Sequence, residues 1–168
     1  ILFYGYIALA IAIALLIVVL AIFFLKKKSR IKRDSDYENE NTILFSWKGM
    51  PPERFEKEVA DIFTRLGYKT EHVGGGNDKG IDVKAWKNGE LYIIQCKRYK
   101  EGDPVRPKAV RELNGAVNRD QAKKGFLITS NEFTWEAKNE GRECPRIELV
   151  DKLRLLKYYK DSLKEKVK

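Results

Sequence analysis

The chain of 168 residues predicts an α/β domain with a mixed central sheet and helices on both faces, preceded by one N-terminal transmembrane helix. Three observations lead to this fold class. The first 25 residues carry no charged side chain. After them, segments with apolar residues at helical spacing alternate with short apolar runs of strand type. Three of these runs follow one another before the alternation resumes, which indicates a three-strand meander within a mixed sheet.

The uncharged start, residues 1–25, has the length and composition of a membrane span. As a helix it would extend roughly 37 Å, and a hydrocarbon core is about 30 Å thick. A secretory signal would have a shorter apolar run and a cleavage site of small residues. Six Lys and Arg side chains follow at 26–33 and predict contacts with anionic lipid and a cytoplasmic location for the rest of the chain. We therefore expect a single-pass membrane protein, with a basic juxtamembrane segment and acidic linker at 26–47 and a globular domain at 48–168.

The first half of the globular domain predicts one helix and three strands. Pro51 and Pro52 open a helix with apolar residues at helical spacing, and Gly67 ends it. Strands are predicted at residues 68–73, 81–86 and 91–97, with a glycine-rich loop at 74–80. The pair Asn88-Gly89 favours a type I′ hairpin turn. The near-continuous apolar run of the third strand indicates that both of its faces are buried.

The second half alternates helices and strands. Residues 107–119 predict a helix with its apolar residues inward, and residues 125–130 predict a buried strand. Thr134 is expected to cap a third helix. A short strand at 146–150 and a basic amphipathic C-terminal helix complete the order.

Charge and cysteine content narrow the chemistry. The net charge of +9 lies in residues 26–33 and in the tail 152–168, while the residues between them sum to −2, so bulk charge does not indicate a nucleic-acid partner. The two cysteines have no CxxC spacing and no histidine cluster accompanies them, which excludes a zinc or iron–sulfur site. His72 is the sole histidine, and a lone histidine at a strand end is more often structural than catalytic.

Three polar residues on neighbouring predicted strands point to one site. Asp82 starts one strand, and Gln95 and Lys97 lie on one face of the next strand because strand side chains alternate. A carboxylate and an amide oxygen suit a hard cation, and a lysine adds positive charge beside it. This combination favours metal-assisted attack of water on a phosphodiester. Singly, Asp82 could cap a turn and Lys97 could be a surface lysine; together the three favour a site.

Six sequence blocks resemble the catalytic domain of Mrr-like restriction endonucleases, a group within the PD-(D/E)xK nuclease superfamily. The resemblance covers roughly residues 50–155. It implies a restriction-endonuclease-like α-β-β-β-α-β core. The blocks are Phe55-Glu56-x-x-Val-Ala, Leu66-Gly-Tyr, Gly76-Asn-Asp-x-Gly-Ile-Asp82, Gln95-Cys-Lys-Arg-Tyr, Val110-Arg-Glu-Leu and Gly125-Phe-Leu-Ile-Thr-Ser.

The resemblance also implies a role for each matched residue. Asp82 would bind Mg²⁺, with Mn²⁺ as an alternative ion. Gln95 would stand in the second acidic position, and the backbone carbonyl of Cys96 would complete the protein ligands. Lys97 would position or deprotonate the attacking water. Glu56 would act as an outer acid that holds metal-bound water or a second ion.

Two features of the matched site leave alternatives open. Asp78 is an auxiliary candidate beside the main set. Gln95 replaces the commoner glutamate, and a neutral amide binds Mg²⁺ less tightly than a carboxylate does, so a weakened or inactive enzyme is an alternative.

DNA is the expected substrate because cationic residues follow the predicted site. Each of them could instead belong to an ordinary solvated helix face. Cutting both strands would ordinarily require a homodimer, and no separate recognition domain is visible. The alternatives are a structure-selective nuclease that cuts junctions or flaps, an inactive DNA-binding membrane tether, and a membrane adaptor whose basic tail binds lipid or protein. The candidate DNA contacts are Arg98, Lys100, Arg106, Lys108 and Arg111.

Overall fold

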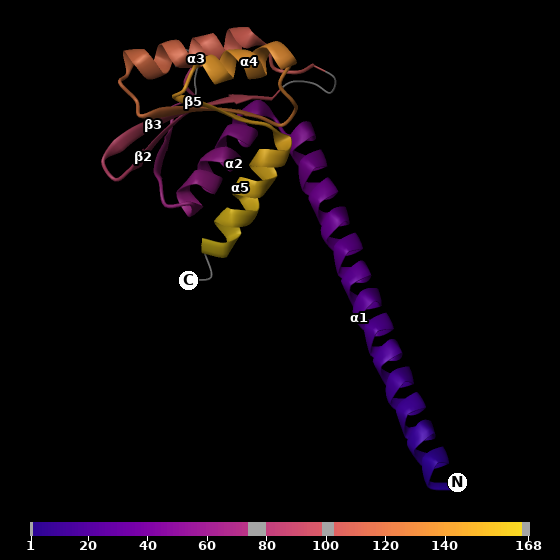
Figure 1. The fold of residues 1–168 in the computed structure, drawn as a ribbon. Helices are drawn as coiled ribbons and strands as arrows, with labels where there is room; N and C mark the ends of the chain where they lie inside the picture. Colours follow the sequence, from indigo (N-terminus) through magenta and orange to yellow (C-terminus); the bar gives the residue numbers. More distant parts are fainter. Residues whose placement is uncertain (1, 74–79, 99–102, 166–168) are drawn as a thin grey trace. The chain divides into compact units, whose positions relative to one another are not determined.

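The computed structural model describes residues 2–73, 80–98 and 103–165, and divides the chain into two compact units. The first unit is Ile1–Thr42 and the second is Ile43–Lys168. One helix, α1 (Leu2–Gly49), begins in the first unit and ends in the second (Figure 1).

The structure of α1 differs in two respects from what the sequence predicted for the N-terminal region. The segment 34–41, expected as a linker, is helical, and no proline or glycine between Gly5 and Gly49 interrupts the backbone there. In the residues that the structure describes, no helix combines the length and apolar character needed to cross a membrane, so the transmembrane helix expected at 1–25 is not supported there. The side chains of residues 1–14 lie outside the described part.

The second unit is built on a five-stranded mixed sheet with the order β1-β2-β3-β4-β5. The first three strands pair antiparallel, and β3 with β4 and β4 with β5 pair parallel. Asn88 and Gly89 adopt φ angles of 53° and 79°, as the predicted type I′ turn requires. The strands are β1 (Lys69–His72), β2 (Val83–Lys87), β3 (Glu90–Lys97), β4 (Lys124–Thr129) and β5 (Ile147–Val150).

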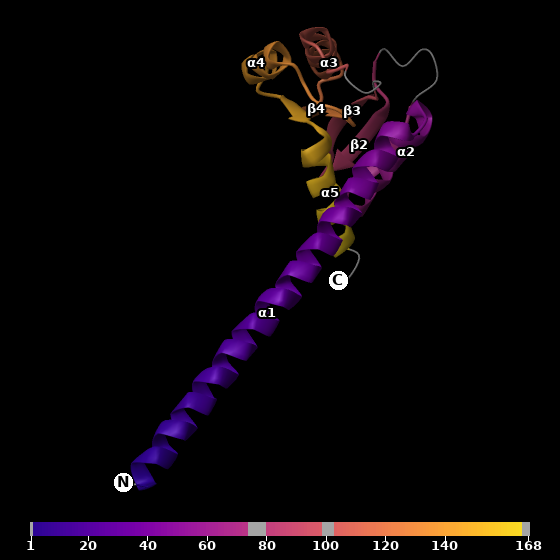
Figure 2. The same ribbon diagram turned by 90° about the vertical axis from the view of Figure 1, so that its right-hand side faces the viewer.

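Four helices cover the two faces of this sheet, which confirms the predicted α/β class. Figure 2 shows α3 and α4 together over one face and α2 and α5 on the other. Ile93 is buried toward α3, and Ile94, the next residue, is buried toward α2 and α5. Full burial of such a side chain contributes about 2 kcal/mol, so packing holds β3 from both sides. The helices are α2 (Pro52–Arg65), α3 (Pro107–Arg119), α4 (Trp135–Glu143) and α5 (Lys152–Glu165).

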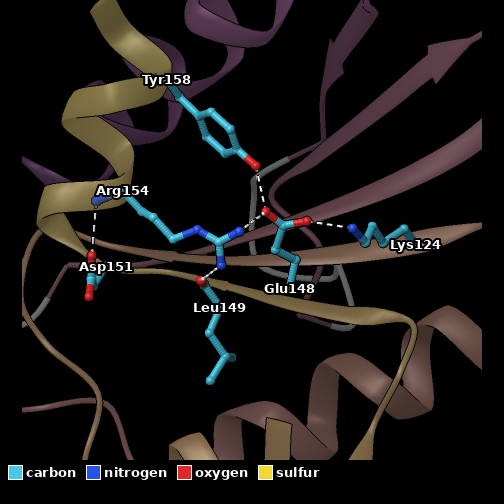
Figure 3. Close-up of polar contacts among 6 residues, drawn as sticks. All are labelled: Lys124, Glu148, Leu149, Asp151, Arg154 and Tyr158. Atoms are coloured by element: carbon cyan, nitrogen blue, oxygen red, sulfur yellow. Dashed lines mark hydrogen bonds and ion pairs between the residues drawn. The ribbon is translucent and has the colours of Figure 1, made fainter. Parts of the chain in front are cut away.

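A buried carboxylate joins α5 to the sheet. Glu148 of β5 accepts hydrogen bonds from the Tyr158 hydroxyl and from Arg154, both on α5, and it pairs with Lys124 of β4 (Figure 3). Burial alone would raise the pKa of Glu148, but these donors outweigh it and hold the pKa below its usual value. The cluster lies where β4 and β5 begin, so it stabilises the fold away from the predicted site.

Candidate active site

The predicted site lies at one end of the sheet, which we call the polar edge: the start of β2 with the last residues of β3 and β4. Parallel pairing sets Gln95 opposite Leu127 and Lys97 opposite Thr129. The β2–β3 ladder reaches Val83 and Ile94. Each strand therefore changes from apolar to polar at this edge, and polar side chains from three strands meet there.

Asp82 is tied to both neighbouring strands. Its backbone N–H donates to the Ile94 carbonyl at 3.0 Å, and its carbonyl accepts from the Val73 N–H at 2.9 Å. The N–H of Cys96 lies beyond the last pair of the β2–β3 ladder, and the Asp82 Oδ2 accepts it at 2.6 Å. The structure thus places the Asp82 carboxylate against the backbone between Gln95 and Lys97.

Gln95 presents a side-chain oxygen that has no hydrogen-bond partner among the described residues. Its side chain is 2% exposed, and within the described residues its Oε1 accepts no hydrogen bond. A buried polar atom in this state costs about 1–3 kcal/mol, which a bound cation would offset. Gly80 faces the same amide: a Cβ at Gly80 would lie 3.0 Å from Gln95 Nε2, and its φ of +80° favours glycine.

The electrostatics of Cys96 show which charges surround the end of β3. Burial raises the pKa of the Cys96 thiol well above its usual value; the negative charges of Asp82 and Glu56 raise it further, and the positive charge of Lys97 lowers it. The thiol is therefore neutral at physiological pH. Of these charged groups, Asp82 contacts the end of β3 directly through the Cys96 N–H.

Glu56 reaches this neighbourhood from α2 with a partner that the sequence did not suggest. Its Oε2 lies 2.9 Å from Nε2 of His72, the last residue of β1. The Glu56 side chain is 16% exposed and that of His72 is 38% exposed. The residue expected to be structural thus contacts a candidate site residue.

Thr129 is a second polar residue at this edge that sequence reasoning did not single out. It is fully buried, its Oγ1 donates to the Lys97 carbonyl at 2.6 Å, and it accepts from the Asn131 N–H at 3.1 Å. These bonds hold the end of β3 to the loop after β4. A polar Thr-Ser-Asn ending after an apolar strand was the available signal.

The candidate DNA contacts occupy different environments. Arg98 is half-buried and its Nη1 donates to the Lys48 carbonyl at 3.1 Å, so its guanidinium faces the end of α1. Arg106 and Lys108 are 78% and 83% exposed, and Arg111 is 59% exposed and pairs with Glu140 at 2.7 Å. Exposed ion pairs of this kind are weak, so these side chains can exchange partners. Lys100 and Asp78 lie outside the described residues.

The residues at the polar edge fit a hard divalent cation. No three His, Cys, Asp or Glu side chains gather into a metal-binding group within the part that the structure describes. A centre here would therefore use amide or main-chain oxygens in addition to carboxylates. Asp82 and Gln95 Oε1, which accepts no hydrogen bond within the described ranges, provide such a set. The Cys96 carbonyl as a further ligand stays a prediction.

The helix-flanked mixed sheet, with Asp82 and a Gln-x-Lys sequence at one edge, defines a domain of the restriction-endonuclease-like nuclease class. A family model for a restriction endonuclease catalytic domain, Mrr_cat, matches residues 47–159. The chain belongs to this family of restriction endonucleases. The expected family is thereby confirmed, together with the α/β fold of the nuclease domain.

One relative and two solved structures extend the comparison. The type IV methyl-directed restriction enzyme EcoKMrr of Escherichia coli (strain K12) is 34% identical over 122 residues, which cover 68% of this chain and 40% of that enzyme. The chain thus spans less than half of this relative's length. The DNA modification-dependent restriction endonuclease AspBHI shares the fold with a TM-score of 0.58 at 12% identity, over 76% of this chain and 38% of its own. The MspJI restriction endonuclease, solved with a 27-mer oligonucleotide, has a TM-score of 0.53 at 16% identity, over 72% and 30%.

Proposed function

We propose that this protein is a metal-dependent endonuclease that hydrolyses phosphodiester bonds in DNA. The observation that carries the proposal is the presence of two oxygens, from neighbouring segments, at the polar edge. The Asp82 carboxylate is fixed by the Cys96 N–H at 2.6 Å, and the buried Gln95 Oε1 has no partner among the described residues. The match of residues 47–159 to a restriction endonuclease family supports phosphodiester hydrolysis as the reaction of this site.

The side chains at the polar edge would have different roles in the reaction. Asp82 and Gln95 would hold Mg²⁺, or Mn²⁺ in its place, with the Cys96 carbonyl beside them. When bound, the ion would supply Lewis-acid activation of the phosphate and a lowered pKa for the attacking water. Lys97 would orient that water and offset the negative charge that develops on the phosphate. Glu56 would accept a hydrogen bond from water at the outer side of the centre.

DNA modified by methylation is the proposed substrate. The proposal is supported by the names of two similar proteins, one methyl-directed and one modification-dependent. The exposed cations near the start of α3 would contact phosphates beside the scissile bond, which makes binding salt-sensitive. Double-strand cutting would use a homodimer, in which each copy cuts one strand.

Membrane anchoring is a separate proposal that rests on the sequence. The uncharged residues 1–25 would span the bilayer, and the six cations at 26–33 would keep the nuclease unit on the cytoplasmic side and contact anionic lipid. Carbonate extraction of membranes tests it: an anchored chain stays in the pellet, and a chain released to the supernatant contradicts the anchor.

The nuclease proposal is tested by plasmid nicking with the full chain purified in mild detergent. Wild type with Mg²⁺ should nick supercoiled plasmid, and Asp82→Ala and Lys97→Ala should each abolish nicking. Asp161→Asn, at an exposed ion pair on α5, is the matched control and should retain activity. Parallel reactions on methylated and unmethylated plasmid test the substrate. Salt-sensitive binding without nicking by wild type would instead indicate an inactive DNA-binding protein.

A further inference from the structure

His72, the last residue of β1, could affect the proposed metal centre through its contact with Glu56. His72 pairs with Val83 in the β1–β2 ladder, so their side chains lie on one face of the sheet. Val83 belongs to the core that includes Phe55 of α2. His72 therefore faces α2, and its Nε2 reaches Glu56 Oε2 at 2.9 Å.

The backbone links this contact to Asp82. Val73, directly after His72, donates its N–H to the Asp82 carbonyl at 2.9 Å. One short segment thus ties the loop that carries Asp82 and also supplies the hydrogen bond that holds Glu56.

The contact restricts a side chain that would otherwise rotate. Glu56 lies near the start of α2, its side chain is 16% exposed, and it has three rotatable side-chain torsions. A hydrogen bond to one oxygen leaves the other oxygen aimed in a fixed direction. His72 pairs with Val83, the first residue of β2, so the Glu56 carboxylate that it contacts lies near the start of β2 at the polar edge.

We infer that His72 is a positioning residue: its Nε2–H holds the Glu56 carboxylate as an outer acceptor at the metal centre. The inference rests on the proposed function, in which Glu56 serves that centre. For this role His72 needs to provide only one N–H donor, at the position of its Nε2. Outer partners of metal centres typically change affinity or activity by about 10–100-fold when removed.

A merely structural ion pair makes a different prediction. With its two side chains 38% and 16% exposed, the pair would contribute little to stability. Loss of His72 should then leave metal affinity unchanged. A measurement of metal affinity therefore distinguishes a positioning role of His72 from a purely structural ion pair.

The test compares His72→Leu, which has no donor, with His72→Gln, whose amide offers an N–H at similar reach, in the full chain. Mn²⁺ affinity is measured by titration calorimetry, and plasmid nicking is measured as kcat and KM. We expect about tenfold weaker Mn²⁺ binding and a lower kcat with unchanged KM for His72→Leu, and recovery of both in His72→Gln. Melting curves should show that both variants are folded.

The double variant His72→Leu with Glu56→Gln tests whether the effect of His72 on Mn²⁺ binding depends on Glu56. If it does, His72→Leu should weaken Mn²⁺ binding no further in the Glu56→Gln background. Equal losses in both backgrounds, or no loss of Mn²⁺ affinity in folded His72→Leu, would overturn the inference. If wild type binds Mn²⁺ but nicks no DNA, the proposed function fails while the positioning role is still decided by affinity.

Discussion

Replacing Gln95 with glutamate changes the charge of the proposed metal centre without changing its shape. The side chain is 2% exposed and lies at the end of β3, beside the backbone that holds Asp82. A carboxylate there would add a second negative charge near Asp82 in the absence of metal and would bind a divalent cation more tightly in its presence. The substitution should therefore lower stability without metal and increase the stabilisation that metal brings.

The size of the effect follows from simple electrostatics. Two unit charges about 5 Å apart at an effective dielectric constant of 20 interact by about 3 kcal/mol. In a chain of this length each kcal/mol shifts the melting temperature by about 2–4 °C. Without metal, Gln95→Glu should thus melt roughly 6–12 °C below wild type. Saturating Mg²⁺ should recover most of that difference, because the ion pairs both carboxylates.

The assay is the melting temperature of the full chain at increasing Mg²⁺, followed by circular dichroism. Gln95→Met is the control, since it keeps the volume and removes the unpartnered oxygen. It should melt at or slightly above the wild-type temperature without metal and should gain nothing from Mg²⁺. If Mg²⁺ stabilises Gln95→Glu no more than wild type, residue 95 does not bind the ion, and the proposed ligand set is wrong.

Three further substitutions test other parts of the structure. Gly80→Ala places a Cβ at 3.0 Å from Gln95 Nε2 on a backbone with φ of +80°, so it should lower stability by about 1–2 kcal/mol in urea unfolding and weaken Mn²⁺ binding. Thr129→Val removes the donor to the Lys97 carbonyl and should cost about 1–3 kcal/mol in the same assay, with reduced nicking. Because the pKa of Glu148 is lowered in the folded state, its stabilisation is present above its unfolded pKa of about 4.5 and is lost as pH falls through the folded value; Glu148→Gln should flatten the acid limb of a stability–pH curve.

The sequence predicted the parts of the site that depend on backbone periodicity. Side-chain alternation placed Gln95 and Lys97 on one face, and the Asn-Gly hairpin brought the start of β2 to the end of β3. The apolar run before them correctly indicated a strand buried on both faces. These rules act over a few residues, so they can be read from one chain.

The contacts that the sequence did not predict join distant elements. Glu56 and His72 come from a helix and an edge strand, and Arg98 donates to Lys48, fifty positions earlier in the chain. Which partner such a long side chain takes depends on how α2 and α1 pack against the sheet. No spacing rule contains that information, so the contact of Arg98 with the end of α1 could not be predicted from its charge and its place after Lys97.

The environment of Gln95 argues against treating its neutral side chain as the mark of an inactive enzyme. When a glutamine oxygen binds a cation, it must usually give up a hydrogen bond that it accepts, at a net cost of about 1 kcal/mol. Gln95 Oε1 has no such bond to lose among the described residues, and burial with Gly80 against its amide restricts its rotation. A cation bound at Gln95 would therefore meet an oxygen that is already desolvated and oriented. Preorganisation of this kind offsets part of the affinity lost with the missing charge, and Asp82, held by backbone bonds to two strands, supplies the charge that remains.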